Sequence, residues 1–157
     1  MRHSRLTGFT FILLLALSTS VQKSHGAQTT AVTLTPVEDS YIDLANNSTT
    51  FGYAPSLLVE NYPLNATYRK MQAWLKFSLA SMIPPQATIL TATLSVRRYD
   101  TGDSMYLAAY RCADSSWSES AITWNNAPLG SLPLDSAYTT RVLMPSGWQA
   151  PGWYSLS

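Results

Sequence analysis

The segment from Trp117 to Pro128 gathers side chains that could contact a ligand. It places Trp117 and Trp124 seven residues apart, with Glu119 between them and an Asn-Asn-Ala-Pro turn directly after. Tryptophan rings can stack on sugars, and a carboxylate accepts hydrogen bonds from hydroxyl groups. The alternative is packing, in which Trp117 covers a short strand that carries Trp124, and Glu119 holds backbone N–H groups. We favour packing, because a segment with a fixed turn more often supports a fold than binds a ligand.

A second group of candidates lies on two stretches in which apolar and polar residues alternate. The alternation predicts an inward set of Leu75, Phe77, Leu79, Ala92, Leu94 and Val96. Residues of the opposite phase form a predicted solvent-facing row, which is the best candidate for a ligand site: Trp74, Lys76, Arg97 and Tyr99. Cations would pair with the carboxylates of an acidic ligand, and aromatic faces would stack on its rings. The alternative is an ordinary solvated strand face in which long side chains cover apolar surface.

Asp39 and Asp43 raise the question of a metal ion, because carboxylate oxygens suit calcium. Residues four apart on an extended strand lie roughly 13 Å from each other, so the two cannot share an ion unless the chain bends. Asp39 with backbone carbonyl groups remains a candidate ligand of a structural calcium ion. We expect that the chain requires no cofactor.

Several kinds of catalysis are excluded by composition. Both histidines, His3 and His25, lie in or at the end of a predicted leader, so the remaining chain has no histidine-based nucleophilic or metal site. Cys112 is the single cysteine, which rules out an intrachain disulfide. A glycosidase needs only two carboxylates, which nine acidic residues could supply, but no paired motif stands out. We therefore expect that the protein is not an enzyme.

The first 26 residues have the three parts of a secretory signal peptide. Arg2 and Arg5 precede an apolar run at 9–17, and a small, polar stretch ends near Gly26. Cleavage after Ala27 and an uncleaved anchor helix are the alternatives. Removal of 1–26 leaves one secreted domain at 27–157, in which 7 basic and 9 acidic residues give a net charge of −2. We expect no nucleic-acid partner, because that would need a dense basic patch, and no membrane association after cleavage.

The sequence of the domain predicts β-strands throughout, because short apolar or alternating runs recur between turn residues. This spacing predicts an all-β fold, an antiparallel β-sandwich of jelly-roll type. The predicted strands are 31–35, 40–44, 56–59, 73–79, 89–99, 105–113, 121–124, 140–144 and 153–156.

Three segments in order resemble one family. The opening is Asp39-Ser-Tyr-Ile-Asp43 with Phe51-Gly-Tyr53, the middle is Leu75-Lys-Phe-Ser-Leu79 with the run at 87–94, and the third is Trp117 to Pro128. The chain resembles the DNRLRE-type domains, also described as disaggregatase-related repeats and family-96 carbohydrate-binding modules. The resemblance implies a non-catalytic jelly-roll module of larger secreted proteins, some of which bind acidic polysaccharides such as alginate. Relatives usually continue past the segment resembling 152–156, so we expect that this chain lacks the last strands.

The leading hypothesis is a secreted, non-catalytic module that binds polysaccharide, with an acidic, alginate-like polymer as the expected partner. With the resemblance, we interpret the row of Trp74, Lys76, Arg97 and Tyr99 as its carbohydrate-binding site. The alternative is a structural or adhesive module of a cell-surface or matrix protein without sugar affinity. Three Asn-x-Ser/Thr sequons, which matter only in a host that glycosylates exported proteins, begin at Asn46, Asn47 and Asn65.

Overall fold

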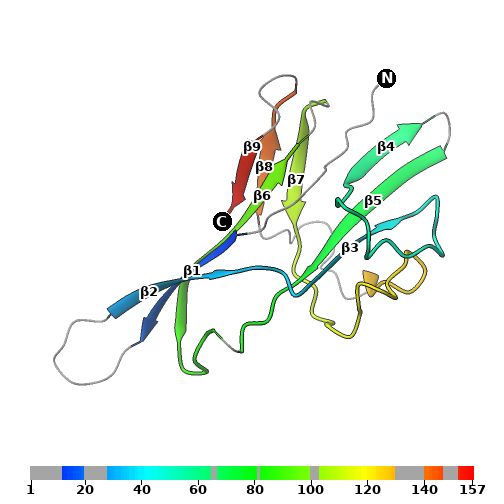
Figure 1. The fold of residues 1–157 in the computed structure, drawn as a ribbon. Coiled ribbons are helices and arrows are strands. Elements are labelled where there is room, and N and C mark those ends of the chain that lie inside the picture. The colour runs from blue at the N-terminus through cyan, green and yellow to red at the C-terminus, as the bar shows by residue number, and fades with distance from the viewer. Residues whose placement is uncertain are drawn as a thin grey trace.

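The computed structural model describes residues 12–19, 28–64, 67–80, 82–99, 103–129, 140–146 and 152–157. Apart from 3₁₀ geometry at Leu129, regular structure in these residues consists of strands, so the all-β prediction is confirmed (Figure 1). None of the described residues forms a helix long and apolar enough to span a membrane. The strands are β1 (Ile12–Thr19), β2 (Gln28–Leu34), β3 (Glu38–Asp43), β4 (Glu60–Leu64), β5 (Thr67–Lys76), β6 (Thr88–Arg98), β7 (Met105–Ala109), β8 (Thr140–Met144) and β9 (Gly152–Leu156).

The strands form three antiparallel sheets with the orders β2-β1-β6-β9, β3-β5-β4 and β7-β8. All three sheets contribute side chains to one apolar cluster, so the core lies between them. The buried members of this main core are Tyr41, Leu57, Val96, Met144 and Leu156. The predicted antiparallel β-sandwich is confirmed, whereas its jelly-roll connectivity stays a prediction.

A second apolar cluster covers the opposite face of β3 and β5. Successive residues of a strand point to opposite faces, and both Tyr41 and Ile42 of β3 are buried. Tyr41 belongs to the main core, and Ile42 packs instead with Trp74, Trp117 and Ile122. The segment that carries Trp117 and Ile122 therefore forms an outer layer on β3 and β5. Sequence alternation did not reveal this layer, because alternation assumes that one face of a strand meets water.

Strand β1 lies between β2 and β6 and pairs with both. It falls within the predicted leader at 1–26, so cleavage after Gly26 would remove it from the sheet. In Figure 1, β1, β2 and the beginning of β6 extend away from the other strands. Ile89 and Leu90 of β6 are exposed there, although they point to opposite faces. Ala92 is exposed for the same reason, and Leu79, which follows the end of β5, is also exposed. The predicted inward positions of these two residues are therefore wrong, while Leu94 and Val96 do reach the main core.

Two predicted strands are wrong. The stretch at 56–59 has no regular structure, and the stretch at 121–124 is a series of turns. In the second case the backbone N–H of Ile122 donates to the carbonyl of Ser118 at 2.9 Å, and that of Ala127 donates to Thr123 at 2.9 Å. These local bonds replace the ladder that a strand would need. The apolar residues there are buried because the loop folds onto β5.

Candidate functional site

The Trp117–Pro128 segment is packed and closed on itself. The buried ring of Trp117 meets Trp74 edge to face, with centroids 5.8 Å apart. The side chain of Asn126 accepts a bond from the backbone N–H of Thr123 at 2.7 Å and donates to the carbonyl of Ala121 at 2.9 Å. This geometry agrees with the packing interpretation and withholds the Trp117 ring from a polymer.

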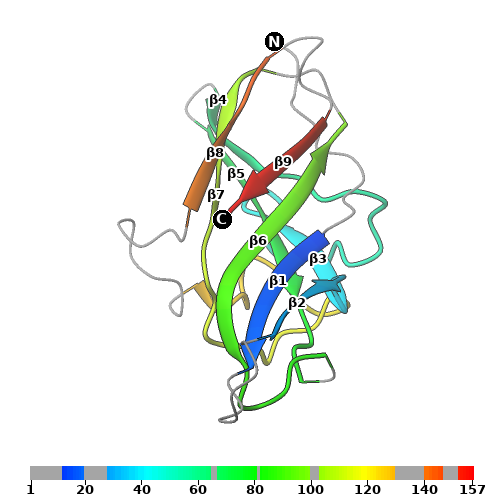
Figure 2. The same cartoon turned by 90° about the vertical axis from the view of Figure 1, so that its left-hand side faces the viewer.

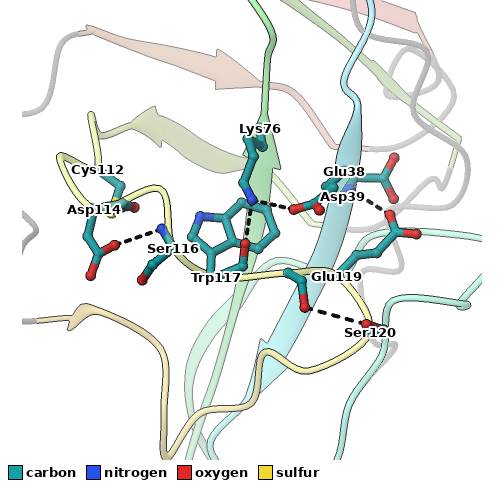
Figure 3. A network of polar contacts seen from close by, with 10 residues as sticks. Glu38, Asp39, Lys76, Cys112, Asp114, Ser116, Trp117, Glu119 and Ser120 are labelled. Carbon is teal, nitrogen blue, oxygen red and sulfur yellow. Dashed lines mark hydrogen bonds and ion pairs between the residues drawn. The ribbon is translucent and has the colours of Figure 1, made fainter.

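Lys76 holds this segment against the sheet (Figure 3). Its ammonium group pairs with the Glu38 carboxylate and donates to the backbone carbonyl of Trp117. It also lies 4.7 Å from the centroid of the Trp117 ring. These three contacts join β5, β3 and the outer layer, so the cation is engaged within the protein.

The predicted row of four site residues is therefore divided. Trp74 was expected to face solvent, and that expectation is wrong, because the outer layer leaves it only 6% exposed. Lys76 is committed to the contacts that hold this layer. Arg97 near the end of β6 and Tyr99, which directly follows that strand, are both exposed, as the alternation predicted. The structure brings these last two together and separates them from the first two.

Arg97 and Tyr99 form a stacked pair on the outward side of β6. The guanidinium carbon of Arg97 lies 4.4 Å from the centroid of the Tyr99 ring, and Nη1 donates to the tyrosine hydroxyl at 3.1 Å. Opposite Arg97 in the β6–β9 ladder is Trp153, which is 48% exposed. In the next outward pair, the hydroxyls of Ser95 and Ser155 lie 3.3 Å apart. We call these five residues the β6–β9 face.

Trp153 was not predicted as a site residue, although the sequence carries a signal for it. In β9 the order is Trp153-Tyr-Ser-Leu156, and Tyr154 and Leu156 pack in or against the main core. Period-two alternation then places Trp153 and Ser155 outward. The pairing of Trp153 with Arg97 required the tertiary structure, because β6 and β9 are far apart in the chain.

Arg98 contributes no charge to the β6–β9 face. Its side chain is fully buried, and its guanidinium donates to the carbonyl of Asp103 and to that of Pro145, both at 3.0 Å. A buried arginine is tolerated where backbone oxygens accept its N–H groups. Arg98 therefore connects β6 with Asp103, which precedes β7, and with Pro145, which follows β8.

Asp39 lies partly buried beside Glu119 (Figure 3). Its backbone N–H donates to Oε2 of Glu119 at 3.2 Å. Burial raises the pKa of the Asp39 carboxyl, and the negative charge of Glu119 raises it further. Asp39 also lines a shallow hollow of about 160 Å³ with residues 54–57. Two neighbouring carboxylates could attract a cation, so the structural calcium ion stays a prediction.

The described ranges contain no cluster of three or more His, Cys, Asp or Glu side chains that could hold a metal. Asp43 is buried at the end of β3 and takes part in a turn. It accepts bonds from the backbone N–H of Ala45 at 2.9 Å and from the side-chain amide of Asn46 at 2.6 Å. Asp43 thus caps the loop after β3 and does not face Asp39 across a site.

The comparison with protein families gives one match. The sequence model of carbohydrate-binding module family 96 matches residues 30–149. This range includes Arg97 and Tyr99, whereas Trp153 follows it. No curated protein and no solved structure gives a significant match.

Proposed function

The chain belongs to carbohydrate-binding module family 96, and we propose that it binds acidic polysaccharide through the β6–β9 face. The observation that carries this proposal is the exposed guanidinium of Arg97, stacked on Tyr99 and directly opposite Trp153. We also propose that the module has no catalytic activity of its own and is secreted after loss of 1–26. An alginate-like polymer is the partner that we expect.

The chemistry of the face suits a sugar that carries a carboxylate. The N–H groups of a guanidinium lie in its plane, and Nη1 of Arg97 donates to the Tyr99 hydroxyl. The other N–H groups of this guanidinium can meet a carboxylate in a two-bond arrangement. The rings of Trp153 and Tyr99 can stack on the apolar faces of neighbouring sugar units. The serine hydroxyls of the next ladder pair can exchange hydrogen bonds with sugar hydroxyls.

Affinity electrophoresis tests the proposal. The mature domain is run through gels that contain alginate, pectin or a neutral glucan, and retardation gives an apparent Kd. We expect retardation in the acidic gels only, and a loss of at least about tenfold in affinity for the variant Arg97→Ala/Trp153→Ala, because both the charge pair and the stacking platform are removed. Arg111→Ala is the matched control, since it removes an exposed arginine elsewhere.

Two outcomes would contradict the proposal. Equal retardation in acidic and neutral gels would remove the role given to Arg97. No retardation in any gel would favour the alternative of a structural or adhesive module. Mass spectrometry of the exported protein tests the leader separately, with a mature chain beginning at Ala27 expected.

A further inference from the structure

A second exposed arginine–tyrosine pair lies on the outward side of β7 and β8. Tyr106 is 62% exposed, and the guanidinium carbon of Arg141 lies 5.0 Å from its ring centroid. In the ladder, Tyr106 pairs with the exposed Leu143, and Arg141 pairs with Ala108, two residues along from Tyr106. The pair therefore spans the two strands diagonally. We call Tyr106, Arg141 and Leu143 the β7–β8 face.

The β7–β8 face points to the exterior, and it adjoins the sheet that carries the β6–β9 face. Val142 and Met144 of β8 and Tyr154 and Leu156 of β9 all pack in or against the main core, so the residues between them point away from it. Strands β8 and β9 contact each other, and Figure 2 shows β8 beside the end of β9.

We infer that the β7–β8 face is a second contact site for the same acidic polysaccharide. This inference rests on the proposed function. The two faces share one recognition chemistry, a guanidinium stacked on a tyrosine with an exposed apolar side chain beside it. The guanidinium of each face can donate N–H bonds to the carboxylates of the polymer. Leu143 offers aliphatic surface where the first face has Trp153.

Two contact sites on one module change how affinity depends on ligand length. Once a long polymer occupies one face, its flanking sugars are held near the other at high effective concentration. A short oligosaccharide occupies only one face at a time and gains nothing from the pair. The polymer should therefore bind more tightly than the sum of two independent sites predicts.

The experiment compares four mature proteins in alginate gels. They are the wild type, Arg97→Ala/Trp153→Ala, Tyr106→Ala/Arg141→Ala, and a protein with all four changes. We expect each two-residue variant to keep measurable retardation with an apparent Kd raised about tenfold or more, because one of two linked contacts is lost. The four-residue variant should migrate as in a gel without polymer. The matched control is Tyr53→Ala/Arg111→Ala, which removes an exposed tyrosine and an exposed arginine outside both faces.

The inference is overturned if Tyr106→Ala/Arg141→Ala binds as the wild type does while Arg97→Ala/Trp153→Ala loses all retardation. That result would leave the proposed function standing, with a single face. A wild type that is not retarded at all would instead contradict the proposed function. The milder variant Arg141→Gln keeps most of the side chain, and a thermal melt of every variant separates lost binding from lost folding. A raised Kd at unchanged Tm supports the inference.

Discussion

Replacement of Gly52 by alanine should destabilise the protein, because the backbone of Glu119 occupies the space of the new side chain. A Cβ atom at Gly52 would lie 2.5 Å from the carbonyl carbon of Glu119 and 3.2 Å from its Cβ. Non-bonded carbon atoms prefer about 3.5–4.0 Å, so the two segments must separate by about 1 Å. Glu119 is held where it is by the Asp39 hydrogen bond and by the packing of Trp117 next to it.

The magnitude follows from these contacts. Overpacking costs about 1–3 kcal/mol, and loss of one hydrogen bond adds about 1 kcal/mol, for a total of about 2–4 kcal/mol. At about 3 °C per kcal/mol for a domain of this size, Tm should fall by about 6–12 °C. Urea unfolding of the mature domain gives the free energy, and a thermal melt gives Tm.

Gly152→Ala is the matched control, because a Cβ there meets nothing within 4 Å. Gly152→Ala should leave the free energy of unfolding unchanged or raise it by up to about 1 kcal/mol, because alanine makes the unfolded chain less flexible. If Gly52→Ala and Gly152→Ala have the same Tm within error, the close approach of Gly52 to Glu119 is not a constraint on the fold, and the reasoning fails.

Four further predictions concern the buried and charged side chains. Lys76→Met should cost about 1–3 kcal/mol in urea unfolding, because Glu38 and the Trp117 carbonyl lose their cation, while an unchanged free energy of unfolding would exclude a structural role. Arg98→Leu should cost about 2–4 kcal/mol, because two backbone carbonyls lose a donor, and a melt like that of Arg111→Ala would contradict this. The raised pKa of Asp39 means that the folded state binds the carboxyl proton more tightly than the unfolded state does. Protonated Asp39 therefore stabilises the fold fully below pH 3.8, and this stabilisation is lost as pH rises through the folded pKa. Between pH 4 and pH 7, the free energy of unfolding measured in urea should accordingly fall more for the wild type than for Asp39→Asn. If Asp39 binds calcium, millimolar calcium should raise the Tm of the wild type and not that of Asp39→Asn, and equal shifts would assign the effect to another site.

The direction in which side chains face was predictable for a strand with one buried face and was not predictable for a strand with two. In β6 the alternation correctly placed Leu94 and Val96 inward and Arg97 outward, because water covers the other side. In β5 the same reasoning placed Trp74 outward, where a loop from far along the chain covers it. Lys76, a charged residue in the same phase, reinforced the error, because its charge suggests a side chain free in solvent, whereas its ammonium group is paired with Glu38.

The candidate site likewise contains residues that the sequence predicts and residues that only the tertiary structure adds. The exposed pair Arg97 and Tyr99 was predictable, because the two residues are two apart in the sequence and keep the phase of the strand, which ends between them at Arg98. The additions from other strands, Trp153 and the Tyr106–Arg141 pair, depend on ladders that no local pattern specifies. Arg98 lies next to Arg97 in the sequence and is buried, because a strand that alternates must send one of two adjacent arginines inward.

The sequence by itself determined the all-β class, the family and the strands whose single apolar face meets a core. Those properties follow from local periodicity and from the order of short motifs, which the chain carries whatever its neighbours are. Only the tertiary structure decided that Trp117 and Trp74 lie in a second core and that Lys76 holds a loop in place. It also decided that the exposed arginines stand beside aromatic rings from other strands. The physical reason is that burial and charge pairing depend on residues distant in the chain, and these are brought together only when the sheets pack.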